Sequence, residues 1–198
     1  PRMSVLKTMF QLSGRGYAAA NLSQATLIIL AAPTASLAGP LALSGMDAAV
    51  ANIKQLLGAA RAAGRPIVHV RHLGTHGGLF DPQGERGEFI NGLEPQGDET
   101  VVEKLLPSAF HGTELKKRLE DLGPLDLIVC GFMSHSSVST TVRAAKNLGF
   151  RCTLVEDACA TRDLPHKGGV LSAEHVHQTE MAIMADNFAT LALTRDFI

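Results

Sequence analysis

Short apolar runs alternate with longer amphipathic segments along most of this chain. Five runs rich in Ile, Leu and Val have the length and composition of buried strands, at residues 26–32, 66–72, 125–132, 150–157 and 188–194. Strands that are apolar on both faces are typical of a parallel sheet covered by helices on each side. The pattern therefore predicts an α/β fold, with three α/β/α layers around a mostly parallel, doubly wound sheet.

The segments between these runs show helical periodicity. Apolar residues from Met46 to Ala60 recur at spacings of four and three, which predicts one helical face packed on a sheet. Ser44 is placed to cap that helix. Further helices are predicted over residues 113–123, 135–149 and 170–186. Residues 73–100 are rich in Gly and Pro without a sustained period, so they are predicted as a long loop over a pocket.

The domain organisation follows from length and pattern. The chain has 198 residues, which suits one domain, and it shows neither an internal repeat nor a linker. Residues 25–198 are therefore predicted to form a single domain. Residues 1–24 are predicted to be an N-terminal arm, because their apolar residues have no place in the sheet.

Composition narrows the classes of partner and location. Hydrophobic residues make up 45% and charged residues 19%, and the formal net charge is -1. These values argue against disorder and against a nucleic-acid-binding surface, and they favour a small-molecule partner. No run approaches the ~20 apolar residues of a membrane span, and the N-terminus shows no signal-peptide pattern. Three cysteines without metal-like spacing fit a reducing cytoplasm.

The most specific chemical signal lies in the run VCGFMSHSSVSTTVRAA. A buried strand passes through Gly131 into a short polar turn and then into a helix that is predicted to begin at about Ser136 or Ser137. Such a turn can present a nucleophile beside backbone N–H groups that hold an oxyanion. Ser at this junction is also the common N-cap residue. Ser137 is therefore predicted to be either a nucleophile or a helix cap.

Two motifs in the chain resemble signatures of the isochorismatase-like (cysteine hydrolase) superfamily. The residues Gly131, Ser134, Ser137, Val138 and Thr141 are similar to the family's Gly-x-x-Thr-x-x-Cys-Val-x-x-Thr. The segment VVEKLLPSAFHGTEL is similar to its Lys-x-x-x-Ser-Ala-Phe-x-x-Thr-x-Leu. The resemblance places the family's catalytic Lys on Lys104 and its nucleophilic Cys on Ser137. It spans roughly residues 25–194 and implies the family's Rossmann-like fold.

A third family signature is changed in this chain. The family's first strand ends in Asp-x-Gln, and its Asp transfers protons; here Ala31 stands at the Asp position and Pro33 at the Gln position. A histidine could substitute as the acid, since its ordinary pKa is near neutral. The candidates are His72, His76, His111 and His135.

The substrate-binding residues are expected beyond the carboxyl ends of the strands, where open parallel sheets bind ligands. Arg71 could hold a substrate carboxylate, or it could bond to a neighbouring Asp or carbonyl. Phe110 and Phe132 are expected to contribute pocket or core packing. The full set of expected substrate-binding residues is Arg71, His72, Phe110, Phe132, Met133, Ser134 and His135.

The remaining histidines do not predict a metal site. His69 and His72 are three apart on a predicted strand and point to opposite faces. His175 and His177 are two apart on a predicted helix, so they diverge by about 200° and are expected at the surface or an interface. We therefore expect neither a metal nor another cofactor.

Two functions fit these observations. The first is a hydrolase of a small amide, or of a related C–N or C–O bond, in which Ser137 and Lys104 stand at the positions of the family's nucleophile and catalytic cation. The alternative is a catalytically inactive pseudoenzyme that binds a small ligand or serves in oligomer assembly. The resemblance also implies a homo-oligomer, in which the N-terminal arm would contact a neighbour.

Overall fold

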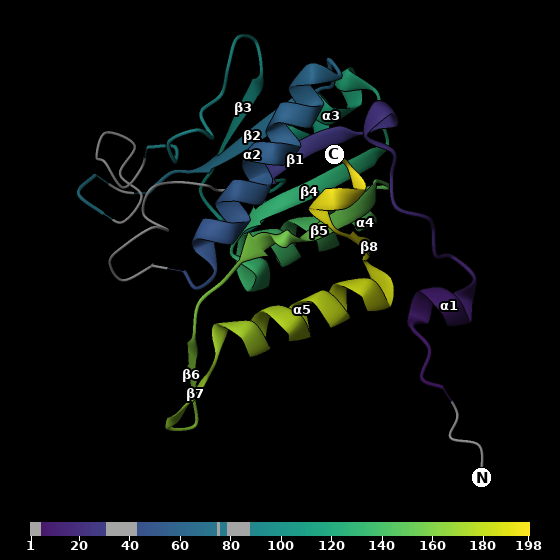
Figure 1. Cartoon of the computed structure of the whole chain (residues 1–198), viewed down its shortest axis with the longest axis vertical. Helices are drawn as coiled ribbons and strands as arrows, with labels where there is room; N and C mark the ends of the chain where they lie inside the picture. The colour runs from purple at the N-terminus through teal and green to yellow at the C-terminus, as the bar shows by residue number, and fades with distance from the viewer. Residues whose placement is uncertain (1–4, 31–42, 75, 79–87) are drawn as a thin grey trace.

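A six-stranded parallel sheet forms the centre of the molecule. The computed structural model describes residues 5–30, 43–74, 76–78 and 88–198. The strands follow the order β3-β2-β1-β4-β5-β8, and every neighbouring pair is parallel (Figure 1). The predicted fold class is therefore confirmed. The strands are β1 (Thr26–Leu30), β2 (Ile67–His72), β3 (Thr100–Lys104), β4 (Asp126–Phe132), β5 (Arg151–Ala160) and β8 (Ala189–Ala192).

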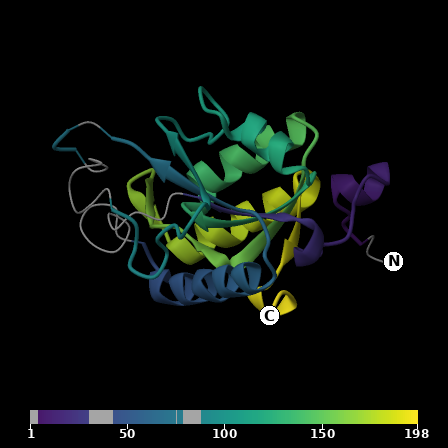
Figure 2. The same cartoon turned by 90° about the horizontal axis from the view of Figure 1, so that it is seen from above.

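Helices cover both faces of this sheet. On one face α2 (Met46–Ala62) buries an apolar stripe that includes Ile53 and Leu57. On the other face α3 (Leu115–Leu122), α4 (Ser139–Asn147) and α5 (Ala173–Asn187) share a second apolar cluster with the strands. Figures 1 and 2 show α2 on the opposite side of the sheet from α3 and α4. The three layers bury both faces, which explains why the strands read as continuous apolar runs.

Two parts of the sheet structure were missed from the sequence. The strand β3 was not predicted, because its five residues TVVEK alternate between buried and exposed positions and contain two charges. Residues 164–171 were predicted as loop and helix start, but they form a hairpin of β6 (Leu164–His166) and β7 (Gly169–Leu171). The omission of β3 matters most, because Lys104 is its last residue.

The helix at the N-terminal end of the described chain packs on a later helix of the same chain. The helix α1 (Met9–Ser13) lies beside α5, where the backbone N–H of Met9 donates to Asp186 Oδ1 at 2.9 Å (Figure 1). Phe10 is buried and meets Tyr17 edge to face at 5.6 Å. The described fold also contains two short 3-10 helices, η1 (Leu22–Gln24) and η6 (Thr194–Asp196).

The backbones of β1 and β4 approach closely at one glycine. Gly131 pairs with Leu30 across the two strands and has a φ of 128°. A Cβ atom at Gly131 would lie 2.1 Å from the carbonyl oxygen of Leu30. Both the backbone conformation and the available space therefore require glycine at this position.

We expect Gly131→Ala to destabilise the protein by about 3 kcal/mol or more, because the backbone clash and the strained φ act together. Gly58→Ala is the matched control. Gly58 lies on the exposed side of α2, where an added Cβ meets no atom within 4 Å. That change should stabilise the helix by about 0.5–1 kcal/mol. Urea unfolding of both variants tests this, and equal stabilities would contradict the close approach of β1 and β4.

Candidate active site

The strand order reverses its direction of growth at β1. From β1 the chain proceeds outward through β2 and β3, and it then returns to the other side of β1 to form β4. The ends of β1 and β4 are therefore the switch point, where open α/β sheets bind ligands. On the β2–β3 side, His72 and Lys104 are paired residues at the ends of their strands. On the β4 side, the chain leaves Gly131 and enters a tight turn.

This turn, residues 133–138, is called the elbow below. It follows a cis peptide bond between Phe132 and Met133 and contains the π-helical turn η5 (Ser134–Val138). The backbone N–H groups of Ser136 and Val138 both donate to the carbonyl of Met133, at 3.1 and 3.2 Å. These two N–H groups are therefore already hydrogen-bonded within the elbow. They are not available to hold an oxyanion, which the sequence had suggested for N–H groups of this turn.

The side chain of Lys104 is buried against the elbow. It is only 1% exposed, and its ammonium donates to three acceptors from three segments. Nζ lies 2.9 Å from Ser137 Oγ, 2.9 Å from His72 Nδ1 and 3.0 Å from the carbonyl oxygen of Leu106. An ammonium has three N–H donors, so this arrangement satisfies all of them. The structure thus brings Lys104, Ser137 and His72 together.

Burial determines the charge state of this cluster. Among the described residues, the ion pairs do not include Lys104, and its three hydrogen-bond partners in this part of the chain are neutral. Desolvation lowers the pKa of Lys104 to about 8. Burial, together with the Lys104 charge, lowers the pKa of His72 to about 4. His72 is therefore neutral at pH 7, and its Nδ1 accepts a hydrogen bond from Lys104. This arrangement does not suit the role of a general acid, which was one of the roles considered for His72.

Ser137 does not cap a helix. It lies within η5, and neither η5 nor α4 has a side-chain capping bond. Its hydroxyl instead accepts a hydrogen bond from Lys104, and the residue is 8% exposed. The predicted helix start at about Ser136 or Ser137 was also late, because the π-helical turn begins at Ser134.

A second set of contacts holds the other side of the elbow. Ser134 Oγ lies 2.6 Å from His177 Nδ1, and His135 Nδ1 forms a short hydrogen bond with Thr161 Oγ1. Burial lowers the pKa of His135. The sequence predicted that His177 lies at the surface or an interface; the structure shows that it is partly buried and reaches from α5 to the elbow. A hydrogen-bond partner at a distance of 43 residues leaves no local pattern that would have revealed it.

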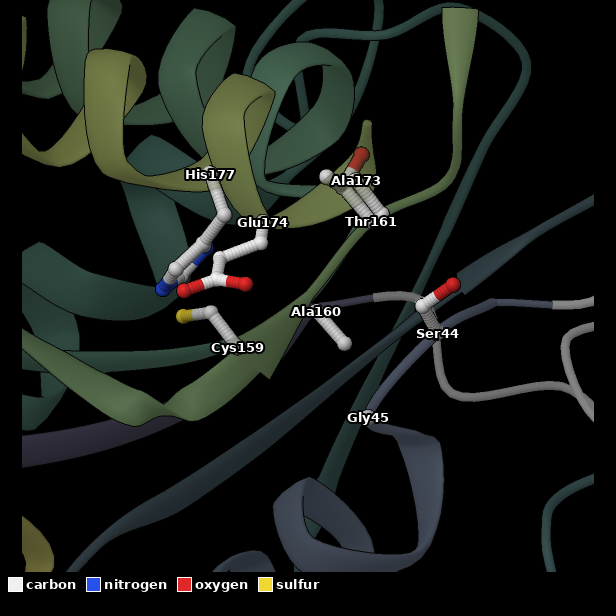
Figure 3. Close-up of a pocket in the computed structure, with 8 residues that line it drawn as sticks. All are labelled: Ser44, Gly45, Cys159, Ala160, Thr161, Ala173, Glu174 and His177. Carbon is white, nitrogen blue, oxygen red and sulfur yellow. The ribbon is translucent and has the colours of Figure 1, made fainter. Parts of the chain in front are cut away.

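A cavity of about 350 Å³ opens beside these contacts. Figure 3 shows the Glu174 carboxylate and the ring of His177 close to the Cys159 sulfur, with Thr161, Ser44 and Gly45 further along the cavity. Burial raises the pKa of the Cys159 thiol to about 12, so this sulfur stays protonated. The cavity lies on the Ser134 and His135 side of the elbow.

The other expected substrate-binding residues are more scattered. Phe132 is 1% exposed and belongs to the core cluster under α2, and Met133 packs against the same cluster. Phe110 stacks on Phe150 with ring centroids 6.1 Å apart and lines a separate cavity between α3 and α4. Arg71 lies over the ring of Phe89 at 5.7 Å. The structure therefore does not bring these side chains to the Lys104–Ser137 pair. Ala31 and Pro33 lie outside the described residues.

No group of His, Cys, Asp and Glu side chains within the described ranges is arranged to hold a metal ion. His69 instead contacts the Glu99 carboxylate at 2.9 Å, and that carboxylate also pairs with Arg61. Among the helices in the described part of the chain, none is both long enough and apolar enough to cross a membrane.

The fold and the two motifs define a class of protein. The isochorismatase domain model matches residues 25–196, and the chain therefore belongs to the isochorismatase family. An isochorismatase from Pseudomonas putida KT2440 is 64% identical, and its structure superposes with a TM-score of 0.96 over 98% of this chain and 100% of that one.

Two further relatives extend this comparison. The isochorismatase family protein YddQ of Bacillus subtilis is 38% identical over 163 residues, which is 81% of this chain and 90% of YddQ. A streptothricin hydrolase of Streptomyces noursei is 34% identical over 144 residues, which is 73% of this chain and 57% of that enzyme. The family to which this chain belongs thus includes hydrolases.

The buried Lys104 makes stability depend on pH. Its pKa is about 8 in the folded protein, against an ordinary value of 10.5 for a lysine in water, so between these values only the unfolded chain holds the proton. Stability from this group therefore rises with pH across that window and is lost as pH falls. From about pH 7 to about pH 9.5 we expect the unfolding free energy, relative to Lys104→Met, to rise by about 2 kcal/mol. A pH-independent difference in urea unfolding would contradict the lowered pKa.

Proposed function

We propose that the protein hydrolyses a small-molecule amide, or a related C–N or C–O bond, with Ser137 as nucleophile and Lys104 as general base. The observation that carries this proposal is the 2.9 Å contact between Lys104 Nζ and Ser137 Oγ. A Lys whose pKa is lowered by burial can deprotonate a serine hydroxyl, and Ser–Lys pairs serve as nucleophile and base in other hydrolases. Membership of a family that includes hydrolases supports the reaction class.

The reaction begins with the neutral form of Lys104. With a pKa of about 8, about one tenth of the molecules carry the free amine at pH 7. The amine takes the Ser137 proton while Oγ attacks the substrate carbonyl, which forms a tetrahedral intermediate. The resulting ammonium returns the proton to the leaving nitrogen or oxygen as the C–N or C–O bond breaks. Water then attacks the acyl-serine ester, with Lys104 again accepting and returning a proton.

Two neighbours prepare Lys104 for this role. The carbonyl of Leu106 and the neutral His72 accept hydrogen bonds from Nζ and aim it at Ser137. Neither neighbour carries a negative charge, so neither raises the pKa of Lys104 again. In this proposal His72 is a positioning residue and does not transfer the proton.

The second candidate is a pseudoenzyme that binds a small ligand. The observation that favours it is the complete satisfaction of the Lys104 ammonium by three protein acceptors, together with Ala at the position of the family's Asp. In this case Ser137 remains a hydroxyl that stabilises a buried charge.

A fluorophosphonate probe distinguishes these candidates without knowledge of the substrate. We expect a covalent adduct on Ser137, identified by peptide mass spectrometry, whose rate of formation rises with pH and levels off above about pH 8. Ser137→Ala should abolish the adduct, and Lys104→Met should slow it by about 100-fold or more, within the range of general-base catalysis.

Ser136→Ala is the matched control for this labelling. Ser136 adjoins the nucleophile in η5, and its backbone bond to Met133 survives the substitution. The variant should label at the native rate. A protein that forms no adduct on Ser137 at any pH, while folded and monodisperse, would favour the pseudoenzyme. A positive result would be followed by a panel of short aliphatic and aromatic amides and esters.

We also propose that the N-terminal arm helps to assemble a homo-oligomer. Val5, Leu6 and Leu12 are 84%, 96% and 67% exposed, although α1 itself packs on α5. Burial of such apolar residues is a common driving force for association. We expect light scattering to show that Leu6→Glu with Leu12→Glu dissociates the native assembly. An unchanged mass, or a native monomer, would contradict this role of the arm.

A further inference from the structure

The elbow has a second hydroxyl–base contact, on elements other than those that hold Lys104. Ser134 Oγ lies 2.6 Å from His177 Nδ1, and His177 Nε2 lies 3.0 Å from the carbonyl oxygen of Glu156. The three groups come from the elbow, α5 and β5. Ser134 is fully buried, so a substrate cannot reach its hydroxyl. Ser134 is therefore not a second nucleophile. Its contact with His177 is a structural link between the elbow and α5.

The direction of each hydrogen bond in this link is determined. A carbonyl oxygen only accepts, so Nε2 of His177 carries the hydrogen and donates to Glu156. Burial lowers the pKa of His177, which keeps the ring neutral and leaves a lone pair on Nδ1. Ser134 must then donate its hydroxyl proton to Nδ1. Each hydrogen-bonding group in the link from Ser134 through His177 to Glu156 therefore has a complementary partner.

The irregular register of β5 makes the Glu156 carbonyl available. Val129 of β4 pairs with Leu154, but Gly131 pairs with Cys159, so four residues of β5 lie opposite one residue of β4. On the other side, the pairing of β5 with β8 ends at Val155. Glu156 therefore lies outside both ladders, and its carbonyl is free to accept from His177.

Movement of Ser134 would be transmitted to Ser137. The carbonyl of Ser134 accepts from the backbone N–H of Ser139, and the Met133 carbonyl accepts from Ser136 and Val138. These bonds close the turn around Ser137, three residues after Ser134. The elbow is thus held from β3 through Lys104 and from α5 and β5 through His177.

We infer that Ser134 and His177 are positioning residues that set the distance between Ser137 Oγ and Lys104 Nζ. The catalytic meaning of this inference rests on the proposed function, but the geometry can be measured without turnover. In the test, Ser137 is replaced by cysteine, and the pKa of the introduced thiol reports how close the Lys104 charge lies.

The reference protein for the experiment is Ser137→Cys. The rate of its alkylation by iodoacetamide, followed over pH by peptide mass spectrometry, gives the pKa of the introduced thiol. The native cysteines do not interfere, because all three are buried and burial raises their pKa values. We expect the introduced thiol to titrate below the ordinary value of about 8.5.

Removal of the link should raise that thiol pKa. In the reference background, Ser134→Ala and His177→Phe should each lower the alkylation rate at pH 7 by about tenfold, which corresponds to a rise of about one pKa unit. The double variant should equal either single variant, since both remove the same contact. Ser134→Thr keeps the hydroxyl and should restore the reference value.

The matched control is His175→Phe. His175 lies on the same helix two residues from His177, but it is exposed, so its replacement should leave the thiol pKa unchanged. A thiol pKa that does not move in Ser134→Ala or His177→Phe would overturn the inference, even if their melting temperatures fall. If Ser134→Ala does not fold, His177→Phe and Ser134→Thr carry the test.

The outcomes separate the two proposals. A shifted thiol pKa in a protein whose native Ser137 resists the fluorophosphonate would support the positioning role and contradict serine catalysis. An unmoved thiol pKa in a protein that labels readily would contradict the positioning role and leave the nucleophile assignment standing.

Discussion

The buried ammonium of Lys104 is the constraint on which the site depends. A charge removed from water must find donors or acceptors in the protein, and here three neutral acceptors from β2, the segment after β3 and the elbow meet it. A carboxylate partner would hold the lysine permanently charged. Neutral acceptors satisfy the ammonium but leave its pKa low, so the same lysine can exist as an ammonium or as an amine near neutral pH.

The rest of the local structure serves this contact. Ser137 reaches Lys104 because the elbow turns sharply after β4, and β4 lies close enough to β1 only because Gly131 has no side chain. The bulged stretch of β5 supplies a backbone carbonyl to His177, and His177 holds the start of the elbow. In the proposed mechanism Ser137 needs a base in direct contact, because a serine is a weaker nucleophile than a thiolate. In our inference the elbow maintains that contact.

The sequence predicted the parts of the fold and site that have local patterns. Apolar runs predicted five of the six strands of the central sheet, and the resemblance of two motifs to family signatures pointed to Lys104 and Ser137, which the structure brings into contact. The strand β3 escaped because its alternation covers only five residues. The contacts of His177 were not predicted because its partners lie far away in the chain, and helical geometry suggested only a position at the surface or an interface. Phe132 was expected to contribute pocket or core packing, and the structure places it in the core cluster under α2, because a residue on a central strand also faces a core layer.

The most direct test of serine catalysis is a crystal structure of the protein after soaking with a small activated ester whose acyl group leaves slowly. If Ser137 is the nucleophile, electron density will run continuously from its Oγ into the acyl group, with Lys104 Nζ still within hydrogen-bonding distance. Density for an intact ester near Lys104, separated from Oγ by a van der Waals gap under conditions where the ester is not hydrolysed, would contradict this mechanism and identify a binding protein.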